Sequence, residues 1–160
     1  MGETSGETAL ENASFPPADA AALLALCAGE WLSLRSSCNP EADADPGSEK
    51  GELRVEWLAA NQGEGGLGNW QLQAPDGSIS QLRFGADGDF EASGGRRGHW
   101  QMLAGGQLQL EYQQGELKLQ ESIWFSKPNL RLRSLLQWQN GELCGARFWS
   151  EIRRLSKPSG

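Results

Sequence analysis

A short stretch of the chain places one carboxylate and two cations within a single predicted hairpin. Glu121 precedes Arg131 and Arg133, which are two residues apart. In an extended strand this spacing sets both guanidinium groups on one face, about 7 Å apart. Such a pair suits two anionic groups of one ligand, or one clamped carboxylate. Spacing alone favours a plainer interpretation, in which exposed arginines alternate with the buried Leu130 and Leu132.

The connection between the two strands determines whether these side chains can meet. A simple two-residue turn would leave Glu121 on one face of the hairpin and the two arginines on the other. A three-residue connection over 127–129, or a β-bulge in the strand, would bring Glu121, Arg131 and Arg133 to the same face. Local alternation is compatible with both arrangements, so both stay open at this point.

Other kinds of chemistry find little support in the chain. The one histidine, His99, has no nucleophile elbow near it, and we interpret it as structural or surface-exposed. The histidine and the three cysteines lack zinc-ligand spacing, so no metal site is predicted. Cys27 and Cys144 are interpreted as core packing, and Cys38 as a free thiol without a basic neighbour. No phosphate-binding glycine motif is present.

The composition is that of one globular domain with an acidic surface. The chain has 160 residues, of which 38% are hydrophobic and 22% charged, and a net charge of -7. That charge argues against nucleic acid or an anionic membrane as a partner. The longest apolar stretch, 20–28, is too short to span a bilayer. An acidic N-terminus and an odd number of cysteines lead us to expect a cytoplasmic protein.

The elements around the charged hairpin are predicted to be almost all strands. We expect a disordered tail over 1–14 and a single domain over 15–156, beginning with a short helix over 20–28. From Trp31 onward the apolar residues recur with a period of two, and Gly, Asn and Asp separate the runs. The predicted strands are 31–37, 52–58, 70–73, 79–84, 89–92, 99–103, 108–112, 116–125, 130–138 and 142–153.

A meander of about ten strands with short connections favours an all-β fold. Its simplest stable form is an up-and-down antiparallel barrel, because closure removes the exposed strand edges. A barrel of this size can hold one small ligand in its interior or at its mouth. Seven tryptophans against one tyrosine indicate a large aromatic core or a cavity lined for a flat ligand.

Three segments of the chain together resemble a known family. They are Ile123-Trp-Phe-Ser-Lys-Pro-Asn-Leu-Arg-Leu-Arg-Ser, Phe148-Trp-Ser-Glu-Ile-Arg, and Ala28-Gly-Glu-Trp-Leu-Ser-Leu-Arg-Ser-Ser. In order and spacing they are similar to the S/U-type phycobiliprotein lyases, the CpcS/CpeS family. The resemblance covers 28–58 and 116–153 and is poor over the Gly-rich 59–115.

The resemblance implies a lipocalin-like or fatty-acid-binding-protein-like barrel that handles a bilin. The bilin, phycocyanobilin or phycoerythrobilin, is a bound substrate, and no intrinsic cofactor is implied. The activity implied is its attachment, through a thioether, to a Cys of an apo-phycobiliprotein α or β subunit of the phycobilisome. That places the protein in a cyanobacterial-type photosynthetic cell, alone, as a homodimer or as a heterodimer with a related lyase. The alternatives are a non-catalytic bilin or lipid carrier, or a non-catalytic partner subunit.

The resemblance also implies the site residues. It gives catalytic roles to Glu121, Arg131 and Glu151. Arg131 and Arg133 suit the two bilin propionates, and a carboxylate such as Glu121 or Glu151 can accept hydrogen bonds from pyrrole N–H groups. Family members often have a histidine shortly after the first-strand arginine, where this chain has Cys38 nearby. The bilin-binding set consists of charged, hydroxyl and flat aromatic residues: Arg131, Arg133, Glu121, Trp124, Trp149, Arg35 and Ser33.

Overall fold

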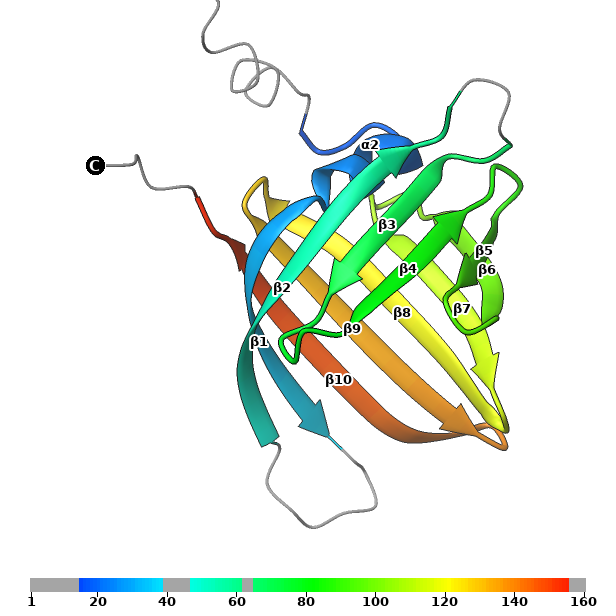
Figure 1. Cartoon of the computed structure of the whole chain (residues 1–160). Coiled ribbons are helices and arrows are strands. Elements are labelled where there is room, and N and C mark those ends of the chain that lie inside the picture. The colour runs from blue at the N-terminus through cyan, green and yellow to red at the C-terminus, as the bar shows by residue number, and fades with distance from the viewer. Residues whose placement is uncertain (1–14, 39–46, 62–64, 156–160) are drawn as a thin grey trace, which may run out of the picture.

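A computed structural model describes residues 15–38, 47–61 and 65–155 and shows a closed antiparallel β-barrel (Figure 1). Each strand pairs with the next along the chain, and β1 closes the barrel by pairing with both β2 and β10. The predicted up-and-down barrel is therefore confirmed. The expected tail 1–14 and residue 156 lie outside the described residues. The elements are α2 (Ala20–Leu26), β1 (Gly29–Cys38), β2 (Gly47–Ala59), β3 (Gly68–Gln73), β4 (Ile79–Phe84), β5 (Asp89–Ala92), β6 (Arg97–Met102), β7 (Leu108–Gln114), β8 (Leu117–Lys127), β9 (Leu130–Gln139) and β10 (Glu142–Arg153).

The second strand starts earlier than its sequence pattern predicts. The sequence pattern predicts a strand over 52–58, but β2 begins at Gly47 because its ladder with β1 continues as far as the pair of Ser37 and Gly47. The side chains of Glu49 and Lys50 are both exposed, so this part of the strand shows no alternation of buried and exposed residues. The pairing partner, rather than burial, extends the strand here.

The helix α2 closes one end of the barrel (Figure 1). Its leucines Leu23 and Leu24 are fully buried in the same core as Trp31, Trp70 and the other core residues. Barrel side chains also satisfy the helix's last carbonyl groups, which have no partners within the helix. The Trp31 indole donates to the Cys27 carbonyl at 2.9 Å, and the Trp70 indole donates to the Leu24 carbonyl at 2.9 Å. No helix among the described residues is long and apolar enough to cross a bilayer.

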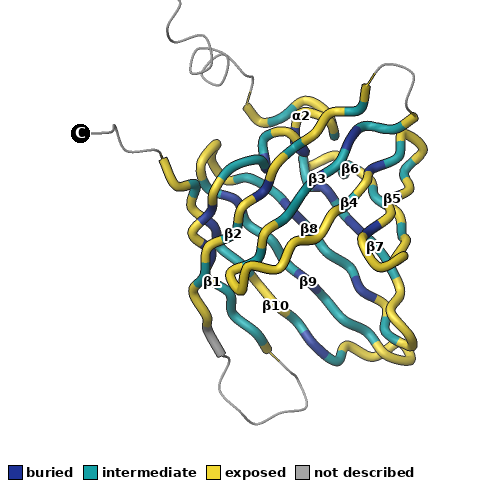
Figure 2. The backbone as a smooth tube through the Cα atoms, in the orientation of Figure 1, coloured by how far each residue is buried: buried dark blue, intermediate teal, exposed yellow. Residues whose placement is uncertain are grey.

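Buried positions recur along the strands of the wall (Figure 2). Most of the apolar core lies beneath α2, and Phe84 packs edge-on against Trp70 there, with ring centroids 4.8 Å apart. The other buried members of this core are Leu23, Leu24, Cys27, Trp31, Val55, Phe90, Leu108, Leu110 and Ile123. The sealed end is thus filled with side chains, and polar residues occupy the interior further along β8, β9 and β10.

The start of α2 depends on one cap. Asp19 accepts a hydrogen bond from the backbone N–H of Ala22 at 2.8 Å, and its own backbone is extended. We expect Asp19→Ala to lower the free energy of unfolding by about 1 kcal/mol, because an N–H in the first turn loses its acceptor. Urea unfolding measures this loss. Asp19→Asn keeps an acceptor oxygen and serves as the matched control, and equal losses in the two variants would contradict the capping role.

Candidate functional site

A β-bulge brings the predicted charged residues to one face. Pro128 and Asn129 form a two-residue turn between Lys127 and its ladder partner Leu130. The next ladder pair is Phe125 with Arg131, so Ser126 is an extra residue in β8. This extra residue reverses the alternation, and Glu121 and both arginines face the barrel interior together. Of the two ways in which these side chains could meet, the bulge is the one the structure shows.

The register arranges the interior residues of β8, β9, β10 and β1 in three successive rows, which we call the inner, middle and outer rows. The inner row lies closest to α2, and the outer row lies furthest from it. The inner row is Phe125, Arg131, Glu151 and Ser33; the middle row is Ile123, Arg133, Trp149 and Arg35; the outer row is Glu121, Leu135, Arg147 and Ser37.

The inner row contains a buried ion pair. The Arg131 Nε donates to the Glu151 Oε1 at 2.8 Å, and the two side chains are 2% and 0% exposed. The Arg131 guanidinium also lies over the Trp31 ring, 4.9 Å from its centroid. Arg133, from the middle row, adds two hydrogen bonds to the same carboxylate, at 2.8 Å and 3.1 Å. Glu151 therefore accepts hydrogen bonds from both arginines, and no described buried side-chain N or O atom lacks a partner.

The two arginines keep Glu151 ionised. Burial alone would raise the pKa of this carboxyl group, but the charges and hydrogen bonds of Arg131 and Arg133 hold it below its ordinary value. The neighbouring Cys27 thiol is the opposite case. Burial raises the pKa of Cys27, and the charge of Arg131 offsets this only in part. Cys27 is therefore a neutral thiol in the core, as its apolar surroundings in the sequence indicated.

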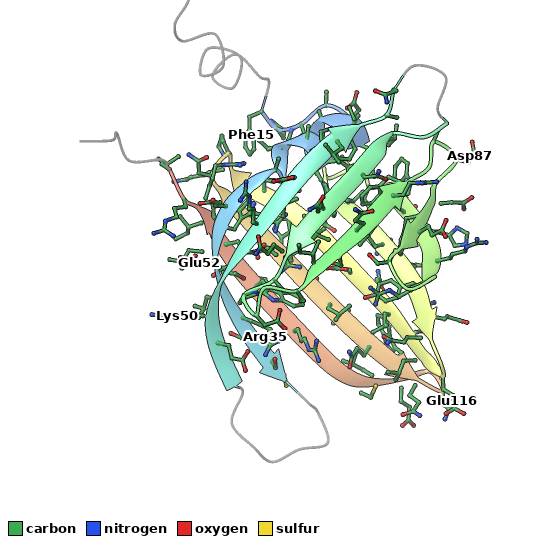
Figure 3. The ribbon with its side chains drawn as sticks, viewed as in Figure 1. Phe15, Arg35, Lys50, Glu52, Asp87 and Glu116 are labelled. Carbon is green, nitrogen blue, oxygen red and sulfur yellow. The ribbon has the colours of Figure 1, made fainter. Side chains whose placement is uncertain are left out.

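Arg133 connects the buried pair to the more accessible part of the interior. Its guanidinium stacks on the Trp149 ring at 4.3 Å, and its Nη1 lies 3.4 Å from the Glu121 Oε1. The Arg133 and Glu121 side chains are 16% and 18% exposed. Arg35, in the same row, is 34% exposed, forms an ion pair with Glu49, and lies near the end of β1 remote from α2 (Figure 3). Both arginines of the middle row are thus more exposed than Arg131 in the inner row.

The structure brings together six of the seven predicted bilin-binding residues and not the seventh. Trp124 lies between the inward-facing Ile123 and Phe125, so strand alternation turns it to the outer face of the barrel. There it contacts Phe148, with ring centroids 6.3 Å apart. We therefore correct the expectation that Trp124 lies with the other bilin-binding residues. The six that face the interior are Glu121, Arg131, Arg133, Trp149, Arg35 and Ser33, and the predicted catalytic residue Glu151 lies among them.

Sequence reasoning assigned no role to Arg153, which ties α2 to the barrel. Its Nη2 donates to the Leu26 carbonyl at 2.7 Å, and its Nε donates to the Asn129 Oδ1 at 2.9 Å. Its guanidinium also lies 4.3 Å from the Trp31 ring centroid. A cation at a helix C-terminus is favoured by the helix dipole. Because β10 and α2 are far apart in sequence, no local pattern could have indicated this contact.

The remaining candidates lie away from the interior rows. His99 is exposed and 3.2 Å from Asp89, as expected for a surface residue. Cys38 is exposed, and Cys144 is only half-buried, so it is less of a core residue than its strand position indicated. Within the described ranges, no group of His, Cys, Asp and Glu side chains is placed to hold a metal ion.

Comparison with known proteins identifies the family. A family model described as CpeS-like protein matches residues 90–154. Chromophore lyase CpcS/CpeS 1 from Paulinella chromatophora is 35% identical over 147 residues, covering 89% of this chain and 92% of the relative. The chain belongs to the CpcS/CpeS family. The resemblance seen in the three sequence segments is thereby confirmed.

Two solved structures share the barrel fold of this CpcS/CpeS family member. The S-type phycobiliprotein lyase CPES from Guillardia theta superposes with a TM-score of 0.69 at 21% identity, covering 84% of this chain and 92% of that one. A protein of unknown function of the DUF3598 family from Nostoc punctiforme superposes with a TM-score of 0.56 at 14% identity, covering 81% of this chain and 48% of that one. At these identities the likeness concerns the fold alone.

The buried carboxylate leads to a pH-dependent stability. The pKa of Glu151 is lowered in the folded state. The ionised carboxylate therefore makes its full contribution to the free energy of unfolding above the ordinary pKa of 4.5, and this contribution is lost as the pH falls through the folded-state pKa. We expect the free energy of unfolding to fall as the pH drops below about 4.5, and to fall less steeply in Glu151→Gln. Urea midpoints over an acidic pH series measure both slopes. Equal slopes in the wild type and Glu151→Gln would show that Glu151 does not contribute to the pH dependence of stability.

Proposed function

We propose that the protein is a chromophore lyase that holds an open-chain tetrapyrrole and attaches it to a Cys of an apo-phycobiliprotein subunit through a thioether. The observation that carries this proposal is the partly exposed Arg133–Glu121 pair, which lies in the barrel interior beside the buried Arg131–Glu151 ion pair. The acceptor Cys supplies the sulfur, so the lyase needs no nucleophile of its own. Its contribution is to fix the chromophore's conformation and position.

Arg133 is the best candidate for a propionate contact. Its bond to Glu121 is long, at 3.4 Å, so a ligand carboxylate can replace it, whereas its bonds to Glu151 hold the guanidinium in place. Arg35 is the second candidate, because it lies in the same row and is more exposed. A planar guanidinium is suited to carboxylate recognition.

Arg131 and Glu151 act as positioning residues in this proposal. Both are almost completely buried, and each already has its partner in the other. Glu121, at 18% exposed, is the more accessible carboxylate, and it can accept hydrogen bonds from pyrrole N–H groups. Trp149 supplies a flat surface beside Arg133, and Ser33 lies next to Glu151 in the inner row.

The proposed setting is the cytoplasm of a cyanobacterial-type cell that assembles phycobilisomes. The substrate is phycocyanobilin or phycoerythrobilin, and the acceptor is an apo-phycobiliprotein α or β subunit. The protein acts alone, as a homodimer, or with a related lyase. A closed barrel with a polar interior would also serve a non-catalytic carrier, so the experiment has to separate holding a bilin from attaching it.

Two measurements test the proposal. Mixing the protein with phycocyanobilin or phycoerythrobilin should shift and sharpen the visible absorption, because the site fixes the chromophore's conformation. Co-expression with an apo-subunit in a bilin-producing host should then raise the yield of the thioether adduct above the spontaneous level. A spectral change without a higher yield identifies a carrier. No spectral change with either bilin would refute both a lyase and a bilin carrier.

A further inference from the structure

The arginines predicted from the sequence leave one carboxylate of a bilin without a dedicated partner. A bilin carries two propionates, one on each of its two central rings. Arg133 is accessible to one of them, but Arg131 is 2% exposed and already bound to Glu151. Arg35 also faces the interior, and its guanidinium forms an ion pair with Glu49. The second propionate therefore calls for a further cation in the interior.

Arg147, on β10, is an interior arginine without a contacting counter-charge. It lies in the outer row, as the ladder partner of Leu135 on β9 and of Ser37 on β1. Its side chain is exposed, and among the residues that the structure describes it forms no hydrogen bond or ion pair. Glu121 belongs to the same row but lies two strands away, on β8. The Arg147 guanidinium is thus available to an anionic ligand.

The charge of Arg147 acts inside the barrel. Tyr112, on β7, faces the interior, where its ring meets the Phe90 ring edge-on with centroids 5.8 Å apart. Burial and the charge of Glu121 raise the pKa of the Tyr112 hydroxyl. The charges of Arg96 and Arg147 oppose this shift. Because β8 and β9 separate β7 from β10, the interaction of Arg147 with Tyr112 crosses the interior.

The barrel wall opposite β9 and β10 is short. β4 and β5 have 6 and 4 residues, whereas β9 and β10 have 10 and 12. β9 and β10 therefore extend beyond the turn between β3 and β4 (Figure 1). The outer row is open on that side, which agrees with the exposure of Arg147. A ligand held beside Arg133 can extend past the short wall and reach Arg147.

The positions of Arg133 and Arg147 suit two carboxylates of one molecule. Arg133 is the ladder partner of Trp149, and Arg147 is the ladder partner of Leu135 on the next interior rung. Residues in this diagonal relation on neighbouring strands lie about 7–8 Å apart. The propionates of a bilin extend from adjacent rings, so a pair of guanidinium groups on adjacent strands can hold both.

We propose that Arg147 binds the second propionate of the bilin while Arg133 binds the first. This inference rests on the proposed function and assigns a specificity to its site, because only a bilin with two free carboxylates makes both contacts. A planar guanidinium can bind each carboxylate through two hydrogen bonds. Two such contacts fix the orientation of the central rings, whereas one contact leaves the chromophore free to rotate about it.

Binding of phycocyanobilin and of its dimethyl ester tests the second contact. Esterification removes both carboxylate charges and leaves the tetrapyrrole intact. We expect Arg147→Gln to weaken binding of the free diacid about 10-fold, because one charge-assisted hydrogen bond is lost at a partly solvated position. We expect a change of less than about 2-fold for the dimethyl ester, since it offers no carboxylate to the guanidinium. Absorption titration measures both affinities.

Arg83→Gln is the matched control for the loss of one positive charge. Arg83 is exposed and points outward from β4, between the inward-facing Leu82 and Phe84. Its replacement should leave both affinities unchanged. Arg35→Gln tests the competing position in the interior. Circular dichroism verifies that each variant is folded, and Arg147→Ala repeats the test if Arg147→Gln is not.

The possible results are distinct. An Arg147→Gln variant that binds the diacid as tightly as Arg83→Gln overturns the assignment, as does equal weakening for the diacid and its dimethyl ester. A loss confined to the diacid that occurs in Arg35→Gln and not in Arg147→Gln gives the second propionate to Arg35, and also overturns it. If the wild type binds neither form, the proposed function itself fails. A wild type that binds bilin without dependence on Arg147 refutes this inference alone.

Discussion

Replacing Glu151 by glutamine is expected to lower the free energy of unfolding by about 3–5 kcal/mol. The substitution keeps the size and hydrogen-bonding capacity of the side chain and removes only its charge. Arg131, at 2% exposed, then lies in the interior without a counter-charge, and Arg133 loses its closest carboxylate. The cost arises from the desolvated guanidinium that stays behind, since burial of an unpaired charge is strongly unfavourable.

Glu121→Gln is the matched control for this prediction. It makes the same chemical change at the second carboxylate that contacts Arg133. The Glu121 side chain is 18% exposed, and its Oε1 lies 3.4 Å from the Arg133 Nη1. We expect a loss of no more than about 1 kcal/mol there, because water screens the pair and can replace the contact. Urea unfolding at neutral pH compares the two. Adding Arg131→Met to Glu151→Gln should restore much of the lost stability, because the unpaired charge is then absent. Equal losses in the two single variants would contradict the buried-pair argument.

Replacing Arg133 by glutamine is expected to weaken bilin binding about 10- to 100-fold. That range corresponds to the loss of one charge-assisted hydrogen bond in a partly desolvated site. The effect should be large because Arg133 is the guanidinium that combines fixed geometry with access to the interior, at 16% exposed. Absorption titration with phycocyanobilin or phycoerythrobilin measures the affinity, and co-expression with an apo-subunit measures the yield of transfer.

Arg97→Gln removes the same charge from the outer wall, where the side chain is 78% exposed, and should leave both readouts unchanged. Since Arg133 also contacts Glu151, circular dichroism at the assay temperature must show that the variant is folded. A folded Arg133→Gln protein that binds bilin as tightly as the wild type would show that this guanidinium does not contact the chromophore.

The sequence determined the strands, most of the turns and the family. Alternation with a period of two places β5 at its observed bounds, because this strand buries Phe90 and Ala92 on one face. The hairpin between β9 and β10 is equally local: Asn140 and Gly141 both adopt positive φ, at 54° and 81°, as the Asn-Gly pair predicts. The family signature is likewise a property of contiguous residues, so it could be recognised without the fold.

Only the tertiary structure decided which of the charged residues meet and how deeply they lie. The bulge at Ser126 turns Glu121 and the arginines to one face, and bulges depend on ladder pairing that local alternation cannot specify. The burial of Arg131 and Glu151 requires β9, β10 and the helix α2 to come together across long sequence separations. Spacing alone favoured Arg131 and Arg133 as exposed residues of a strand. The fold instead makes Arg131 a buried support and leaves Arg133 facing the accessible interior.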